Sequence, residues 1–441
     1  MTMLSPKKRQ EVLDALRRGT VPQDGLDVLA VGLDRFRAPM DQELRRTSDG
    51  GCGFKAVRGD YGCGKTFFSR WLQQEARALN FATAEVQISE TETPLHKLET
   101  VYRRMLERLA TSSARSGAFR GIIDNWFFAL EEDVINAGGV GQGGDERALL
   151  TATSELMEKR LVSISNTAPS FAAALRAYRE CLAQGDTAMA EGLIAWLSGQ
   201  PNVAATVKRR ANIKGDVDHF TALSFLQGLL AVLKDSGHPG LVLVLDEVET
   251  LQRVRADSRE KALNALRQLI DELDAGRFPG LYLVITGTPS FFDGPQGLKK
   301  LPPLAQRLQT DFDTDIRFDN PRAPQIRLKP FDMDMMIEVG GKVRDLFADG
   351  SSSPERVRSM ADDELILSLA RGVAGSLGGK TGIAPRIFLK KLVADLLDRI
   401  ELHEAFNPRK DYRLTIRNDE LTMEERNAMP ASSIEDISLD L

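Results

Sequence analysis

The chain has 441 residues, enough for two to four domains at roughly 100–200 residues each. Its hydrophobic share of 42% and charged share of 27% exclude a chain that is disordered throughout. The net charge of −5 excludes an overall basic surface, so any nucleic-acid site would have to be a local patch.

The cysteines and the apolar runs indicate the cellular compartment in which the protein is expected. Three cysteines with no CxxC or Cys/His cluster argue against a disulfide framework and against a zinc site. The N-terminus lacks the apolar stretch of a signal peptide, and no apolar run approaches the roughly 20 residues needed to cross a bilayer. We therefore expect a cytoplasmic protein without a membrane segment.

The first elements in chain order are helical. Val12, Leu13 and Leu16 stand at helical spacing, and Gly19 and Pro22 follow them, so residues 1–27 are predicted to form a helix and a linker. A short apolar run and a glycine turn come next, and a helix is expected from about Asp34.

An alternation of strands and helices begins near residue 53. The pattern predicts a strand at 54–58, a glycine-rich loop, a helix at 67–80 and a second strand at 81–89. A strand, a helix and a strand at this spacing form a βαβ unit, which indicates a parallel sheet with helices on both faces. The predicted fold class is therefore α/β.

Helical patterns interrupt this sheet and then follow it. Residues 95–235 show helical patterns and no convincing strand, so we predict a large helical insertion. Strands are expected again at 240–249, 280–288 and 325–331, with a helix at 259–274, which gives an α/β domain over residues 28–331. Three helical patterns predict a C-terminal helical lid domain at 332–404, and the polar, acidic residues 405–441 predict a loosely ordered tail.

The sequence GDYGCGKT at 59–66 has the form of a phosphate-binding Walker A loop. Its glycines, Gly59, Gly62 and Gly64, allow backbone N–H groups to turn toward phosphate oxygens at the start of a helix. Lys65 is expected to reach the β- and γ-phosphates, and the Thr66 hydroxyl to bind Mg²⁺. The neighbouring Cys63 and Phe67 complete the residues that we assign to ATP binding. The alternative is a glycine-rich turn that binds nothing, but a strand before the loop and a helix after it favour a phosphate site.

The sequence LVLVLDEVE has the form of a Walker B motif. Five apolar residues predict a buried strand that places Asp246 at the carboxyl edge of the sheet, where it can hold Mg²⁺. Glu247 follows it and is positioned to polarise a water for attack on the γ-phosphate. This acidic pair favours a hydrolase over a P-loop kinase, which transfers phosphate to a bound acceptor and does not need the second carboxylate.

Further polar residues follow in an order that resembles the AAA+ ATPases. The strand ending at 286–288 carries Thr286 and Thr288, and Arg307 and Arg386 come later in the chain. Together with the Walker motifs, this order is similar to the initiator-like branch related to origin-recognition and helicase-loading proteins. The resemblance implies a P-loop AAA+ ATPase with an oligomeric assembly.

The AAA+ resemblance also implies roles for these residues. Thr288, with Thr286 as the alternative, would contact the γ-phosphate or the attacking water. Arg307 would serve the neighbouring subunit as an arginine finger, with Arg267 as a weaker candidate. The stretch GIAPR at 382–386 resembles a sensor 2 motif, in which Arg386 would fold from the lid onto the phosphates.

The phrases around these motifs narrow the resemblance. The stretches RRGTVPQDGLDVLAVGLDRF, GDYGCGKTFF, LVLVLDEVETL and VITGTPSFF are similar to the BREX phage-defence ATP-binding proteins of the BrxC/BrxD type, and the length favours the shorter BrxD-like member. This family resemblance covers residues about 10–404. It implies a role in restricting bacteriophage DNA beside a methyltransferase and other ATPases or helicases.

The sequence does not decide whether the protein binds DNA or how it uses ATP. Lys208, Arg209, Arg210 and Lys214 form a basic patch in the insertion, which could contact phosphates or could be an ordinary solvated helix face. No winged-helix pattern is clear after residue 404. We therefore carry two hypotheses: an oligomeric ATP hydrolase that acts on DNA beside other phage-defence proteins, and an ATP-gated interaction module with slow hydrolysis.

Overall fold

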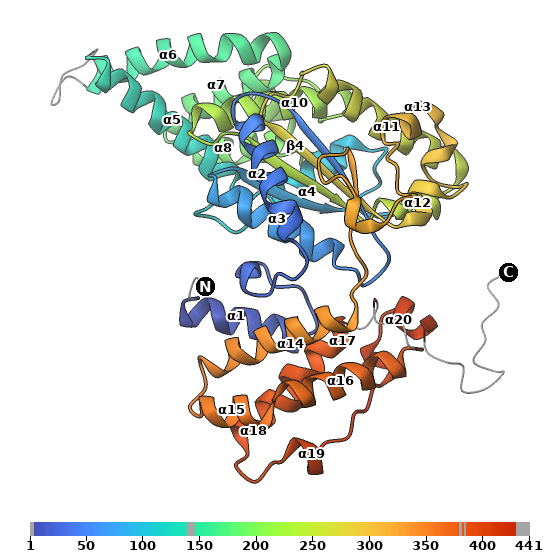
Figure 1. Cartoon of the computed structure of the whole chain (residues 1–441). Coiled ribbons are helices and arrows are strands. Elements are labelled where there is room, and N and C mark those ends of the chain that lie inside the picture. Colours follow the sequence, from blue (N-terminus) through green and yellow to red (C-terminus); the bar gives the residue numbers. More distant parts are fainter. Residues whose placement is uncertain (1–3, 139–145, 379–381, 383–384, 429–441) are drawn as a thin grey trace.

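The computed structural model describes residues 4–138, 146–378, 382 and 385–428. Its centre is one sheet of five strands, all parallel, in the order β2-β3-β4-β1-β5 (Figure 1). The strands are β1 (Gly53–Arg58), β2 (Ala82–Gln87), β3 (Leu241–Asp246), β4 (Leu281–Gly287) and β5 (Gln325–Arg327). The predicted α/β class with a parallel sheet is confirmed.

Helices cover both faces of this sheet, which explains why β3 is apolar at every position from Leu241 to Leu245. Alternate residues of a strand point to opposite faces. Val242 and Val244 therefore share a core with α2 (Asp34–Ser48) and α3 (Lys65–Ala78). Leu241, Leu243 and Leu245 share the opposite core with α4 (Leu98–Glu107), α10 (His219–Asp235) and α11 (Ala256–Asp274).

The strand order brings distant segments to one edge of the sheet. In the pairing register, Arg58 lies opposite Gly287, and Gln87 lies opposite Asp246. Since all strands are parallel, the carboxyl ends of β1, β2, β3 and β4 meet at the same edge. Two short helices follow β4, namely α12 (Pro289–Asp293) and α13 (Pro302–Arg307).

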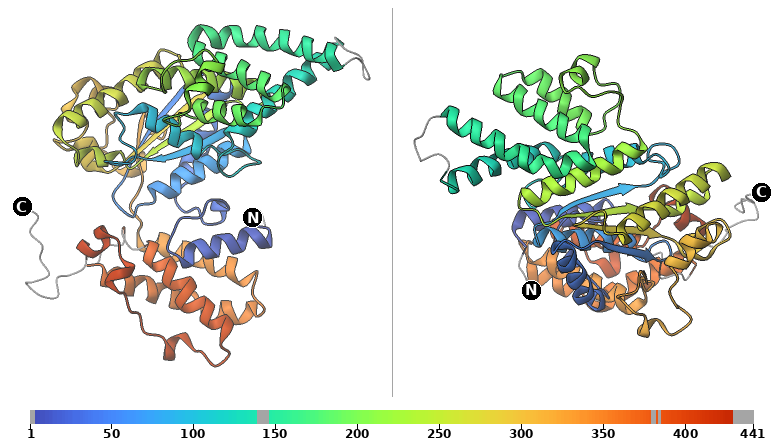
Figure 2. Two further views of the ribbon diagram at one scale, coloured as in Figure 1. Left: turned by 180° about the vertical axis from the view of Figure 1, so that it is seen from behind. Right: turned by 90° about the horizontal axis from the view of Figure 1, so that it is seen from above.

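The described residues between β2 and β3 form seven helices and no strand. Besides α4 and α10, these helices are α5 (Phe119–Asn136), α6 (Glu146–Thr167), α7 (Pro169–Ala183), α8 (Thr187–Leu197) and α9 (Ala205–Arg210). The Asp186 side chain caps α8 by accepting a hydrogen bond from the Met189 N–H at 3.1 Å. Figure 2 shows α5 and α6 extending away from the sheet.

A second group of helices forms its own apolar core after β5. They are α14 (Met333–Ala348), α15 (Pro354–Met360), α16 (Asp363–Ser376), α17 (Pro385–Lys390), the π-helical stretch η6 (Lys391–Leu397) and α18 (Asp398–Leu402). Of the three helical patterns within residues 332–404, the second covers residues 354–373, where the structure has two helices. The Asp362 side chain accepts a hydrogen bond from the Leu365 N–H at 2.9 Å and so caps a new helix at that point.

The N-terminal helix α1 (Pro6–Arg17) packs on this C-terminal bundle (Figure 1). Its apolar residues Val12, Leu13 and Leu16 share the core of the bundle. Arg17 also forms an ion pair with Asp398 at 2.7 Å. Residues from the two ends of the chain therefore build one helical bundle below the sheet, and the path from α1 to α2 crosses between the two parts.

The chain beyond residue 404 differs from the loosely ordered tail that we predicted. Residues 405–428 run along the bundle and include α19 (Pro408–Asp411), η7 (Asn418–Glu420) and α20 (Met423–Ala428). Leu421 is 4% exposed, and the Glu420 carboxylate pairs with Lys390 and Lys391 at 3.1 and 2.9 Å. The rest of the predicted tail, residues 429–441, lies outside the described residues.

The Glu420 ion pairs predict a pH-dependent contribution to stability. Burial disfavours the charged form of Glu420, but donors from Lys391, the Arg417 N–H and Lys390 outweigh this and lower its pKa to about 2. An unpaired Glu has a pKa of about 4.3, so the stabilisation is complete above that pH and is lost as the pH falls toward 2. Glu420→Gln should therefore lower the melting temperature at pH 7 and lower it less at about pH 3. The control is Glu404→Gln, at an exposed position. An equal fall in melting temperature at pH 7 and at about pH 3 would contradict the prediction.

Candidate functional site

The loop between β1 and α3 has the geometry expected of a phosphate cradle. Gly62 and Gly64 have φ values of 81° and 90°, which side chains rarely permit. Gly59 is required for a different reason, since a Cβ there would lie 2.2 Å from the Cys63 Sγ. Lys65 opens α3, and its Nζ donates to the Gly59 and Asp60 carbonyl oxygens at 2.8 and 3.2 Å. Burial raises the pKa of Cys63 to about 11, so a neutral thiol lines the loop.

The acidic end of β3 contacts this loop directly. The Thr66 hydroxyl donates to Asp246 Oδ2 at 3.2 Å, although the two residues are 180 positions apart in the sequence. The Thr286 hydroxyl donates to the other oxygen of Asp246, and the Glu247 N–H donates to the same oxygen at 3.1 Å. Asp246 is buried. The structure thus brings Lys65, Thr66 and Asp246 together at the carboxyl edge of the sheet.

Glu247 is turned toward the edge strand. Its backbone is left-handed, with φ of 60°, and its carboxylate oxygen Oε2 accepts a hydrogen bond from the Gln87 Nε2 at 2.9 Å. Gln87 was absent from the predicted site residues. The sequence places Gln87 near the end of the predicted strand at 81–89. Only the pairing of β2 with β3 brings it beside Asp246 and Glu247.

The structure separates the two threonines proposed as a sensor. Thr286 makes the contact with Asp246, whereas the hydroxyl of Thr288 lies 2.9 Å from the Ser290 hydroxyl. The reason is the register of the parallel strands: Ile285 lies opposite Leu245, so Thr286 is the residue level with Asp246. Thr286 therefore replaces Thr288 as the residue that contacts the site.

The two candidate arginine fingers lie away from the loop, on α11 and α13. Arg307 ends α13 and forms an ion pair with Asp271 of α11. Its side chain is 39% exposed. Arg267 lies one turn before Asp271 on α11. Neither arginine lines the cavity beside the phosphate loop.

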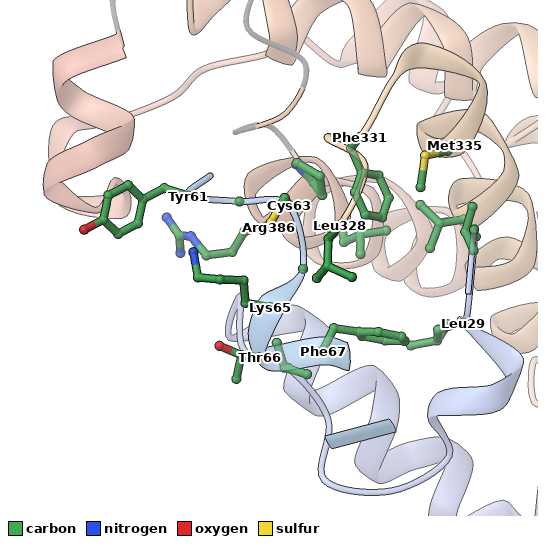
Figure 3. Close-up of a pocket in the computed structure, with 18 of the residues that line it drawn as sticks. Leu29, Tyr61, Cys63, Lys65, Thr66, Phe67, Leu328, Phe331, Met335 and Arg386 are labelled. Atoms are coloured by element: carbon green, nitrogen blue, oxygen red, sulfur yellow. The ribbon is translucent and has the colours of Figure 1, made fainter. Parts of the chain in front are cut away.

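A cavity of about 310 Å³ opens beside the loop, between the sheet and the C-terminal bundle (Figure 3). Its walls come from the linker after α1, the phosphate loop, the end of β3, the stretch from Leu328 into α14, and α17. The apolar residues of these walls include Leu29, Val31, Phe67, Leu328, Phe331, Met335, Val339 and Leu389. Apart from Phe67, none of these was predicted, because each belongs to an ordinary apolar pattern. A mostly apolar slot next to an anion cradle suits a ligand with a flat ring at one end and phosphates at the other.

Arg386 of α17 also lines this cavity, but Glu425 holds its guanidinium. The Arg386 Nε donates to Glu425 Oε1 at 2.9 Å, and a terminal nitrogen donates to the Glu420 carbonyl oxygen at 2.5 Å. The side chain of Glu425 is only 5% exposed in this ion pair. Within the GIAPR stretch, residues 383 and 384 lie outside the described part of the chain. The predicted phosphate-sensing arginine thus lies beside the site while paired with α20.

The sequence matches one protein family along nearly its whole length. This family is described as BREX system ATP-binding protein BrxC/D, and the match covers residues 4–416. The chain belongs to the BrxC/D family. The resemblance inferred from the phrases around the Walker motifs is confirmed, and with it ATP binding in the BREX phage-defence system. No curated protein matches the sequence.

The residues at the loop of this BrxC/D-family protein fit a magnesium ion. Thr66 and Asp246 offer a hydroxyl and a carboxylate, the hard oxygen donors that Mg²⁺ prefers, and they are already within hydrogen-bond distance. In the described ranges no group of three or more His, Cys, Asp or Glu side chains could hold a metal by itself. The ion would therefore be held jointly by these two side chains and the ligand's phosphates.

The basic patch in the insertion is partly neutralised. Lys208 pairs with Asp216 at 2.6 Å, and Arg210 pairs with Glu180 at 3.2 Å. The other two members, Arg209 and Lys214, are exposed. This leaves fewer free cations for phosphate contacts than the sequence suggested. None of the described helices is long and apolar enough to cross a membrane.

Proposed function

We propose that this chain is an ATP hydrolase of the AAA+ type that assembles into oligomers and acts on DNA in BREX phage defence. Residues 28–331 form its ATPase domain, and residues 332–404 form a lid over the nucleotide. Lys65 binds the β- and γ-phosphates, Thr66 and Asp246 hold Mg²⁺, and Glu247 polarises the attacking water. Other BREX components are its expected partners.

The contact between Thr66 and Asp246 supports this proposal most directly. It joins the phosphate loop to the acidic strand end, so an ion bound there would touch both the protein and the phosphates. The apolar cavity adjoins the same loop and has room for a base. Lys65 donates hydrogen bonds to carbonyl oxygens of the loop. In a complex with ATP, phosphate oxygens would take the place of these carbonyl oxygens, because they are charged and therefore stronger acceptors.

One observation favours the second candidate, an ATP-gated interaction module with slow hydrolysis. Three of the charged groups proposed to act on the γ-phosphate have a side-chain partner within the protein: Gln87 for Glu247, Asp271 for Arg307 and Glu425 for Arg386. Arg307 and Arg386 could reach a γ-phosphate only after their contacts open, and Gln87 holds one oxygen of Glu247. If the protein is an oligomeric hydrolase, assembly or DNA binding would open these contacts. If it is an interaction module, the contacts would keep turnover slow while ATP controls partner binding.

ATP turnover measured with double-stranded DNA, with single-stranded DNA and without DNA distinguishes the two candidates. The mass of the protein is measured at the same concentration. The hydrolase predicts Mg²⁺-dependent ATP binding, oligomers and turnover that rises with assembly or DNA. ATP binding with slow turnover that neither assembly nor DNA changes would support the interaction module. Absence of ATP binding would contradict both.

A further inference from the structure

Glu249 is a buried carboxylate that the proposed mechanism leaves unused. It lies in the short helix η2 (Val248–Gln252), three residues after Asp246, and it is 5% exposed. Neither of its carboxylate oxygens has a hydrogen-bond partner among the described residues. Burying a carboxylate without a partner is costly, so such groups are rare in folded proteins and call for an explanation.

The surroundings of Glu249 are those of the phosphate site. It lines the same cavity as Lys65, Thr66 and Asp246. Burial raises the pKa of Glu249, and the Lys65 ammonium is the group that most opposes this rise. The two nearby carboxylates, Glu247 and Asp246, raise its pKa further. The side chain is therefore close enough to the loop for its charge to matter there.

The other acceptors and donors of the site already have partners. Asp246 accepts from Thr66, Thr286 and the Glu247 N–H, and Glu247 accepts from Gln87. Lys65 donates to loop carbonyl oxygens. The oxygens of Glu249 are buried acceptors without a partner in the described part of this site, and a ligand that brings donors would satisfy them.

Magnesium in nucleotide sites usually keeps several water molecules, which donate hydrogen bonds to nearby carboxylates. We propose that Glu249 is a positioning residue of the phosphate site whose carboxylate accepts hydrogen bonds from the water shell of the magnesium ion held by Thr66 and Asp246. This inference rests on the proposed binding of magnesium and ATP. It gives the unpartnered oxygens a function and explains why a carboxylate is buried three residues beyond the metal-binding one.

The test compares metal binding by wild type, Glu249→Gln and Glu249→Asp. Mn²⁺ replaces Mg²⁺, and electron paramagnetic resonance measures its affinity in the presence of the non-hydrolysable ATP analogue AMP-PNP. Removing an outer-shell partner typically costs about 10–100-fold in metal affinity, so we expect that loss in Glu249→Gln. Glu249→Asp, which keeps a carboxylate, should recover part of it. AMP-PNP binding in EDTA should not weaken in either variant, because no metal ion is bound there.

Glu260→Gln is the matched control, because Glu260 is exposed on α11 and away from the loop. Wild-type Mn²⁺ affinity in a folded Glu249→Gln variant would overturn the inference and leave the proposed function intact. If Glu249→Gln does not fold, Glu249→Ala serves for the same measurement and the same two outcomes. Failure of the wild type to bind AMP-PNP at all would overturn the proposed function and this inference together.

Discussion

Glu247→Gln is expected to lower ATP turnover by about 100-fold to 10,000-fold, the usual contribution of a general base. The amide has nearly the same shape as the carboxylate but cannot take a proton from water. ATP affinity should remain close to that of the wild type, because Asp246 and Lys65, which we propose to hold the ion and the phosphates, are unchanged. Phosphate release in single-turnover experiments measures the rate, and calorimetric titration with ATP measures the affinity.

The location of Glu247 makes this variant informative about both candidate functions. Its carboxylate accepts a hydrogen bond from Gln87, and an amide at position 247 can still accept one, so the fold around it should persist. Glu260→Gln, at an exposed position of α11, is the control and should keep full turnover. If wild type and Glu247→Gln turn over ATP equally, the hydrolase proposal fails and slow background hydrolysis by an interaction module remains.

Lys65→Ala is expected to weaken ATP binding by about 100-fold, equal to about 2.7 kcal/mol. Lys65 is buried in the loop beside the glycines, and its loss removes the side-chain cation that we propose to bind the phosphates. The loop backbone should survive, because the positive φ angles of Gly62 and Gly64 do not depend on Lys65. Calorimetric titration with ATP in the presence of Mg²⁺ measures the change.

Lys214→Ala provides the control for this charge change. Lys214 is exposed in the helical insertion, so its removal lowers the net charge equally without touching the loop. It should bind ATP as the wild type does. Equal ATP affinity of Lys65→Ala and wild type would show that ATP binds elsewhere, and the site assigned around residues 59–66 would have to be abandoned.

The sequence was most informative where the chemistry is local. The apolar run at 241–245 predicted a strand buried on both faces, and the structure contains it as β3. The glycines of the phosphate loop and the helix after them were predicted from a pattern of eight residues, because backbone geometry there depends on residue type. Periodicity also predicted α1 and α14, whose buried faces repeat at helical spacing.

Contacts between distant segments were not predictable in this way. Gln87 reaches Glu247 only because β2 pairs with β3 in one particular register. The apolar cavity wall needs the linker after α1, the loop and α14 together. The pairing of Arg386 with Glu425 depends on the segment after residue 404 folding back over the bundle.

The sequence by itself therefore determined the α/β class, the family and the composition of the phosphate loop, since each depends on residues that are neighbours in the chain. Only the tertiary structure decided which threonine contacts Asp246 and which partners hold Glu247 and Arg386. It also showed that Glu249 is buried without a hydrogen-bond partner among the described residues. Strand register and burial result from the packing of segments that are far apart in the sequence. Local sequence patterns do not specify that packing.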